Sequence, residues 1–194
     1  VGTASFISRQ IRLRYYASIV QTGNYTGVRG SSQQFWSITG GFRYVCDFNI
    51  SDTAYGSNTM QFYGLGAYNV DLNYGGSNMY NVSTLSNIIG VGNDASDTNL
   101  QVFYNGASGT ASKIDLGSGF PANRTSGTAS TTVYSIQLYN EPGTSSVKYE
   151  VTNRETGTVT NGTITSNLPS SSLLLNYFAS RTIGNPVSNT GQFD

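Results

Sequence analysis

The stretch of the chain that includes the irregular segment Val70–Val82 gathers side chains that suit the binding of a sugar. Sugar sites combine aromatic faces, on which a ring stacks, with amide and carboxylate groups that hydrogen-bond its hydroxyls. Trp36, the only tryptophan, and Tyr25 are candidates outside this stretch. The alternative is that the tyrosines serve packing or subunit contacts. The candidates within the stretch, which includes the irregular segment Val70–Val82, are Asn69, Asp71, Asn73, Tyr74, Asn78 and Tyr80.

A second stretch offers oxygen ligands for a cation. Asp94, Asp97 and Asn99 lie within one short polar segment and are the residues we expect to bind calcium, if calcium binds. Calcium takes roughly 6–8 oxygen ligands, which is more than this segment supplies. The alternative is that Asp94 and Asp97 accept hydrogen bonds from backbone N–H groups and stabilise a turn. No other cofactor is indicated.

Several reaction classes lack the residues that they need. The chain has no histidine and one cysteine, which excludes Ser-His-Asp and Cys-His catalysis and ordinary zinc sites. A glycosidase needs two carboxylates facing each other at roughly 5–9.5 Å. The ten acidic residues are scattered singly, although spacing along the chain does not fix distances in space. We therefore expect a binding protein without catalysis.

The charge pattern bears on the partners. Ten basic and ten acidic residues give a net charge of zero. A nucleic-acid binder needs clustered basic residues, and a segment bound to an anionic membrane needs a polybasic run; the sequence has neither. No apolar run approaches the ~20 residues of a membrane-spanning helix. We expect neither nucleic-acid binding nor membrane insertion.

The clearest element that could position these groups is a hairpin within Ser86–Asp115. The apolar run Ile88–Val91 ends at a polar turn, and Leu100–Tyr104 is a second strand-forming run. Two such runs joined by a polar turn indicate an antiparallel hairpin. The Asn105-Gly106 pair that closes the second run is a strong turn signal.

Other segments repeat the same pattern. Phe42–Ile50 alternates most regularly, which places Arg43, Asp47 and Asn49 on one face of a strand and Cys46 among the apolar side chains of the other. Cys46 is therefore expected to be a small buried hydrophobe. Gly64 and Gly66 indicate a bulge or a close backbone approach. We expect a break at Asn161-Gly162 in the strand Thr158–Ser166, and we expect Leu173–Thr182 to lie in the interior of a sheet. The other predicted strands are Ile11–Ser18, Gln34–Ile38, Met60–Tyr68, Ser112–Leu116, Thr131–Asn140, Ser146–Thr152 and Gln192–Asp194.

The composition supports an all-β fold in one domain. Charged residues make up 10% of the chain, against about 25% in an average domain. About a dozen short strands at regular spacing are typical of a sandwich or barrel. The 194 residues suffice for a core without disulfides, so residues 1–194 are expected to form a single domain. Because the chain begins at Val1 without a signal-peptide pattern, we expect a piece of a longer protein.

Several segments resemble one group of proteins in their amino-acid sequence. They are VRG followed by FW, GGFRYVCDFNI, SNIIGVGNDASDTNLQVFYNGASGTASKIDLG, VYSIQLYNEPG, VKYEVTNRETGTVTNGTI and the leucine run after Leu168-Pro169. This pattern is similar to the receptor-binding head domains at the tips of bacteriophage tail fibres, over most of Val28–Leu173. The resemblance implies an antiparallel jelly-roll β-sandwich of the concanavalin (laminin-G-like) type. It rests on many short matches and assigns no residue a role.

The resemblance also implies a function. It suggests a non-enzymatic host-attachment domain at the virion tail tip, outside the cell, which binds a bacterial surface polysaccharide or protein as a homotrimer. Low charge and many aromatic residues suit subunit contacts, and several copies strengthen weak contacts. Two alternatives stay open: a polysaccharide depolymerase or lyase of the same fold, and a purely structural tail or capsid decoration domain.

Overall fold

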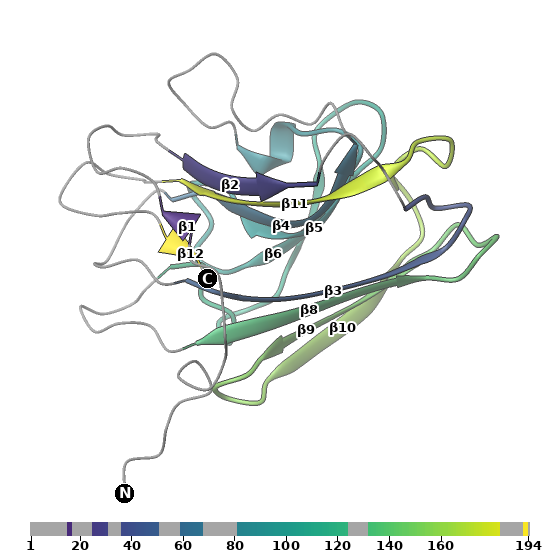
Figure 1. Cartoon of the computed structure of the whole chain (residues 1–194). Helices are drawn as coiled ribbons and strands as arrows, with labels where there is room; N and C mark the ends of the chain where they lie inside the picture. Colours follow the sequence, from purple (N-terminus) through teal and green to yellow (C-terminus); the bar gives the residue numbers. More distant parts are fainter. Residues whose placement is uncertain are drawn as a thin grey trace, which may run out of the picture.

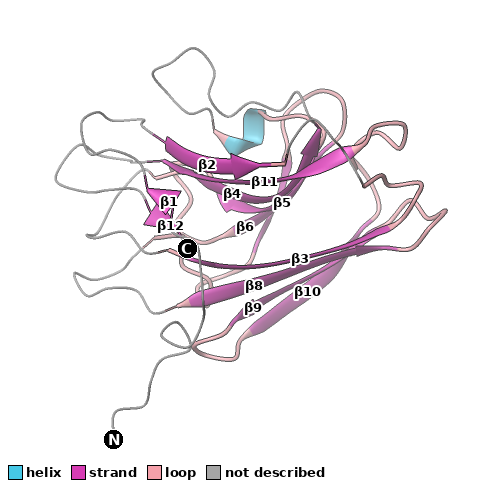
Figure 2. Ribbon diagram, in the orientation of Figure 1, coloured by secondary structure: helices cyan, strands magenta, loops and turns pink. Residues whose placement is uncertain are grey.

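The chain forms two antiparallel sheets packed face to face, as a computed structural model shows (Figure 1). The structure describes residues 15–16, 25–30, 36–50, 59–67, 81–123, 132–182 and 192–193. This part of the chain holds 12 strands and one short 3-10 turn, η2 (Val82–Thr84). Strands account for nearly all of the regular structure drawn in Figure 2, which confirms the predicted all-β class.

The two sheets differ in size. The smaller sheet has four strands in the order β10 (Val159–Ile164), β9 (Val147–Asn153), β8 (Val133–Asn140) and β3 (Phe42–Asn49). The larger has six, in the order β2 (Tyr25–Arg29), β11 (Leu175–Thr182), β4 (Gln61–Ala67), β5 (Ile88–Asn93), β6 (Gln101–Asn105) and β7 (Ser112–Asp115). A separate pair joins β1 (Tyr15–Tyr16) to β12 (Gln192–Phe193). This is the jelly-roll β-sandwich that the sequence predicts.

The predicted hairpin is confirmed. β5 and β6 are antiparallel, with Ile88 opposite Asn105 and Gly92 opposite Gln101. After Asn105 the chain turns back and β7 pairs with β6. β11 lies between β2 and β4, in the interior of its sheet as predicted. Two predictions were wrong: β10 runs through Asn161-Gly162 without a break, and residues 36–38 contribute an isolated bridge at Trp36 in place of a strand.

Strand β3 follows its predicted alternation for most of its length. Phe42, Tyr44 and Phe48 are buried, whereas the side chains between them are exposed. Cys46 is half-buried and packs against the core, so the prediction of a buried cysteine holds only in part. Asn49 departs from its predicted exposed face and is buried, because both faces of the strand end are covered.

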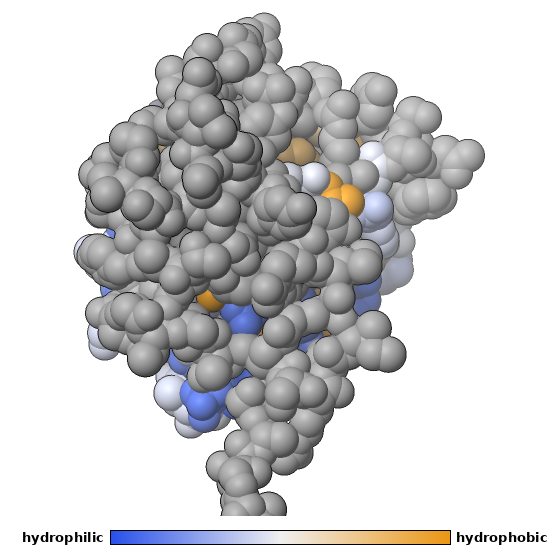
Figure 3. Space-filling view, turned by 60° about the vertical axis from the view of Figure 1, so that its left-hand side comes forward, coloured by the Kyte–Doolittle hydropathy of each residue, from blue (hydrophilic) through white to orange (hydrophobic). Residues whose placement is uncertain are grey.

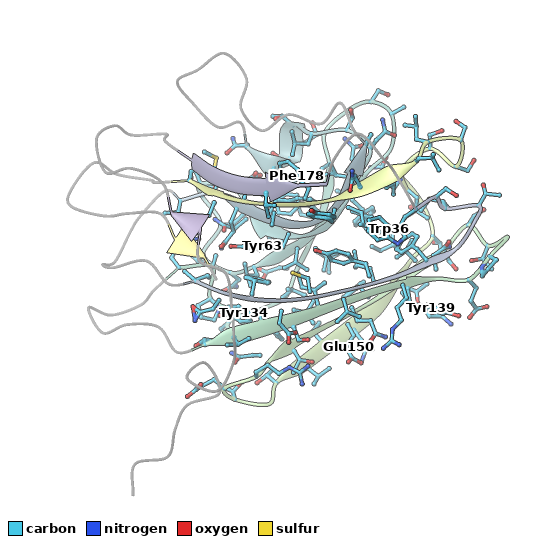
Figure 4. All side chains as sticks on the ribbon, viewed as in Figure 1. Trp36, Tyr63, Tyr134, Tyr139, Glu150 and Phe178 are labelled. Carbon is cyan, nitrogen blue, oxygen red and sulfur yellow. The ribbon has the colours of Figure 1, made fainter. Side chains whose placement is uncertain are left out.

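The main apolar core lies between the two sheets. The ring of Phe48 on β3 stacks on Tyr63 of β4, with ring centroids 3.7 Å apart. Tyr134 of β8 packs against Phe48 at 5.4 Å (Figure 4). Residues of both sheets therefore join in one cluster, as burial of the inward faces of a sandwich requires.

A second apolar cluster covers the outer face of the six-stranded sheet. Its buried members are Phe62, Ala67, Val82, Leu85, Ile88, Phe103 and Ala111. All residues of β4 and β5 are buried, so this sheet has no solvent-facing side at these strands. Gly64 lies opposite Gly90, and a Cβ on Gly64 would come 2.5 Å from the Gly90 Cα. The predicted close backbone approach is confirmed at Gly64.

The outer face of the four-stranded sheet is open to solvent. Its outward residues include Arg43, Val45 and Asp47 on β3 and Lys148 and Glu150 on β9, all exposed. The coloured residues in the lower part of Figure 3, on the side where Figure 1 places this sheet, are mainly hydrophilic. One face toward the core and one toward water is usual for an antiparallel sheet.

Candidate functional site

Most of the predicted sugar contacts lie outside the described residues. This holds for Asn69, Asp71, Asn73, Tyr74, Asn78 and Tyr80. Tyr25 belongs to β2, of which only the backbone is described at this position. These residues stay predictions. Trp36 is the one predicted sugar contact whose side chain the structure describes.

Trp36 lies beside the end of β11. It forms an antiparallel bridge with Leu175, in which the Leu175 N–H donates to the Trp36 carbonyl oxygen at 2.6 Å and the Trp36 N–H donates back at 3.4 Å. The indole lies between the two sheets (Figure 4), is half-buried and packs against the main core. Part of the ring therefore serves packing, as the alternative interpretation expects, and part stays accessible.

The predicted calcium ligands surround a lysine. The Lys113 ammonium on β7 lies 3.0 Å from a carboxylate oxygen of Asp94 and 2.9 Å from one of Asp97. The two carboxylates are mostly buried, with 6% and 15% of their side-chain surface exposed, against 32% for Lys113. The positive charge between the two acids is thus supplied by the chain itself. Lys113 also lies over the Phe103 ring, 5.4 Å from its centroid.

The same carboxylates stabilise the turn between β5 and β6. Asp97 accepts a hydrogen bond from the Asp94 N–H at 2.8 Å, and Asp94 accepts one from the Ser83 N–H at 3.0 Å. These contacts favour the turn-stabilising alternative. Asn99 is not brought to this cluster: its amide donates to the Asp115 carboxylate at 3.1 Å. Within the described residues, no three His, Cys, Asp or Glu side chains could hold a metal ion together.

Two pKa shifts follow from this arrangement. Burial lowers the pKa of Lys113, but its hydrogen bonds to Asp97 and Asp94 outweigh that effect and raise the pKa above its ordinary value. The pKa of Asp115 is lowered, chiefly because the Gly117 N–H donates to its carboxylate at 2.7 Å. Both groups are therefore held in their charged forms at neutral pH.

A buried polar network lies at the end of the six-stranded sheet. Arg181 on β11 is fully buried; it donates to Gln61 Oε1 at 2.6 Å and to Asn123 Oδ1 at 3.1 Å. Gln61 in turn donates to Asn93 Oδ1 and to the Ala122 carbonyl oxygen, both at 2.7 Å. A buried guanidinium is tolerated only when such partners replace its water. Arg181 and Gln61 are both fully buried, so their hydrogen bonds serve the scaffold.

This network ties together strand ends from distant parts of the sequence. Thr59, just before β4, donates to Asn123. The Met60 N–H donates to Thr182 Oγ1, and the Thr182 N–H donates to the Met60 carbonyl oxygen, both at 2.8 Å. These residues adjoin three connecting segments, 51–58, 124–131 and 183–190. The network therefore fixes the described strand ends next to these segments.

Sequence reasoning missed Lys113, Arg181 and Tyr177. Tyr177 is on β11, two residues beyond the partner of Trp36, and 39% of it is exposed. Alternation within Leu173–Thr182 could have placed Tyr177 on the face of Leu175. No pattern along the chain joins Lys113 to Asp94 or Arg181 to Gln61, because these partners belong to different strands.

Two further described acids have partners of their own. Asp115 is engaged by Asn99 and Gly117, and Glu141 pairs with Lys148 at 3.1 Å on the exposed surface. Nothing helical in the described part of the chain is long and apolar enough to cross a membrane.

The comparisons with known proteins concern the fold. No family model matches the chain, and no curated protein matches it by sequence. Peanut lectin with a 9-residue peptide aligns with a TM-score of 0.56 and 11% identity, over 92% of this chain and 82% of the lectin. Lectin UEA-II in complex with galactose aligns with a TM-score of 0.54 and 16% identity, over 92% and 83%. A Bauhinia forficata lectin in complex with GalNAc aligns with 0.54 and 9%, over 92% and 82%. The chain thus has the lectin-type, concanavalin-like β-sandwich, which confirms the predicted fold class.

Proposed function

We propose that this chain is a saccharide-binding host-attachment domain of a bacteriophage tail fibre and that it has no catalytic activity. The observation that carries the saccharide is the sandwich itself, which is similar to lectins solved with galactose and GalNAc bound. The phage context is supported by the sequence resemblance over Val28–Leu173.

The proposal extends to the assembly. Residues 1–194 form one domain at the distal end of a longer fibre chain, exposed at the virion tail tip, and three copies associate. Strand β10 at the edge of the four-stranded sheet supports self-association, because Val159–Ile164 contains none of the charged or proline residues that protect exposed edges. Light scattering of the purified domain should give three times the 20.7 kDa chain mass, and a monomeric mass at high concentration contradicts this part.

Asn73, Tyr74, Asn78 and Tyr80, with Trp36, are the proposed ligand contacts. The test is binding of the purified domain to an array of bacterial surface polysaccharides. We expect selective binding that a chelator does not abolish, because the Lys113 ammonium already lies between Asp94 and Asp97. If no polysaccharide is retained at the high local density of an array, the saccharide proposal fails and a protein receptor or structural role replaces it.

Catalysis is tested on the same ligands. A depolymerase or lyase would release new chain ends from any polysaccharide that the domain binds. We expect no increase in reducing ends or unsaturated products after prolonged incubation. Their appearance would overturn the non-enzymatic assignment.

A further inference from the structure

An aromatic pair lies on the inward face of β11, at the side of the sandwich. Trp36 faces Leu175 in an antiparallel bridge, and Tyr177 is two residues further along β11. Residues facing each other across a bridge share one side of the sheet, and so do residues two apart on a strand. Trp36 and Tyr177 are therefore diagonal neighbours, with a backbone separation of roughly 7–8 Å that aromatic side chains can span.

The pair is accessible although this face is otherwise closed. Leu175 is fully buried and Ala179 is 8% exposed, whereas Tyr177 between them is 39% exposed. It is the one aromatic residue among the exposed large hydrophobic side chains of the described residues.

The chemistry of the pair points to a neutral sugar. Indole and phenol rings offer flat apolar surface for the C–H face of a pyranose, and each carries one polar group that can hydrogen-bond a hydroxyl. The flanking segments, residues 36–41 and 168–177, contain no charged residue, so an acidic sugar would find no partner charge within them. We infer that Trp36 and Tyr177 form a stacking platform for an uncharged pyranose ring of the bacterial polysaccharide. This inference rests on the proposed saccharide-binding function and assigns the ring contact to Tyr177.

The fluorescence of Trp36 reports ligand binding at this site, because Trp36 is the only tryptophan in the chain. Titration of the domain with its best neutral array ligand should quench or shift the Trp36 emission in parallel with binding measured by calorimetry. Galacturonic acid oligomers, as charged counterparts, should produce neither signal.

Tyr177→Ala should weaken binding of the same polysaccharide at least tenfold, whereas Tyr177→Phe, which keeps the ring, should retain most of the affinity. Tyr139→Ala is the matched control, because Tyr139 is a half-buried tyrosine on the four-stranded sheet. This variant should bind the polysaccharide with wild-type affinity. Thermal unfolding verifies that each variant is folded, and Tyr177→Phe provides the comparison if the alanine variant is not.

The outcomes separate the two proposals. If the wild type binds polysaccharide but Trp36 emission is unchanged and the Tyr177→Ala variant binds normally, the stacking platform is refuted while the saccharide function stands. If the wild type binds no polysaccharide, both are overturned together.

Discussion

Gln61→Leu offers the sharpest test of the buried network. Gln61 is fully buried and its amide makes four hydrogen bonds: to Asn93 and the Ala122 carbonyl as donor, and from Arg181 and the Tyr63 hydroxyl as acceptor. Leucine fills a similar volume but offers no polar atom. The substitution therefore isolates the hydrogen bonds from the packing.

The magnitude follows from the groups left behind. Two acceptors, Asn93 Oδ1 and the Ala122 carbonyl oxygen, lose the Gln61 donor, and the Arg181 guanidinium and the Tyr63 hydroxyl lose their Gln61 acceptor. Each buried unsatisfied group costs about 1–3 kcal/mol, and the gain from burying an apolar side chain offsets part of this, by about 1–2 kcal/mol. We expect a loss of at least about 3 kcal/mol in the free energy of unfolding. In a chain of this size that lowers Tm by roughly 6–12 °C.

Gln101→Leu is the matched control. Gln101 is also buried, at 7% exposure, but donates to a single carbonyl oxygen, that of Asn99, at 3.2 Å. Its other neighbour, Asp115, is exposed and can recover its hydration. We expect a loss of about 1 kcal/mol. Urea unfolding followed by the emission of Trp36 and by circular dichroism measures both variants. If Gln61→Leu costs no more than Gln101→Leu, the network does not hold the strand ends together.

Two further predictions concern charge and pH. Lys113→Met should lower the free energy of unfolding by about 1–3 kcal/mol at neutral pH, because Asp94 stays buried without its cation. The control Lys148→Met breaks an exposed pair and should change the free energy of unfolding by less than about 1 kcal/mol. A rise in wild-type Tm with added calcium would contradict the assignment of Lys113 as the cation between the two acids. Burial raises the pKa of Tyr134, so its neutral form stabilises the fold fully below the unfolded pKa of about 10 and this contribution is lost as the pH rises above it. Tyr134→Phe should cost about 1 kcal/mol near pH 8, through loss of its hydrogen bond to the Pro121 carbonyl oxygen, and should lose less stability than wild type between about pH 10 and 11; parallel pH profiles in urea unfolding would refute the reasoning.

The sequence predicts the sandwich well because its evidence is local. Alternation in Phe42–Ile50 and the two runs joined at residues 92–97 each specify one strand or hairpin. The break expected at Asn161-Gly162 was wrong because β10 pairs with β9 along its whole length. Pairing with β9 keeps Asn161-Gly162 extended, although this residue pair is common in turns. Such pairing is a tertiary effect that no local sequence pattern contains.

The two-sided burial of the six-stranded sheet illustrates a second limit. Phe62 and Phe103 belong to an outer cluster, but from the sequence they differ in no way from residues that face the main core. Which face is covered depends on where Val82 of η2 and Leu85 pack against the sheet. Lys113 shows the same limit for chemistry: the segment Asp94–Asn99 predicts a cation, and the cation in the structure is a side chain from β7.

Stability and recognition should respond to different residues in this molecule. Arg181 and Gln61 are fully buried, and they fix where the connecting segments leave the scaffold without touching solvent. Tyr177 lies at the surface, with 39% of it exposed. Substitutions in the network should therefore lower Tm and leave the affinity of the folded fraction unchanged. Substitution of Tyr177 should do the reverse. A domain built this way can change its surface contacts without weakening its core, since the two sets share no side chain.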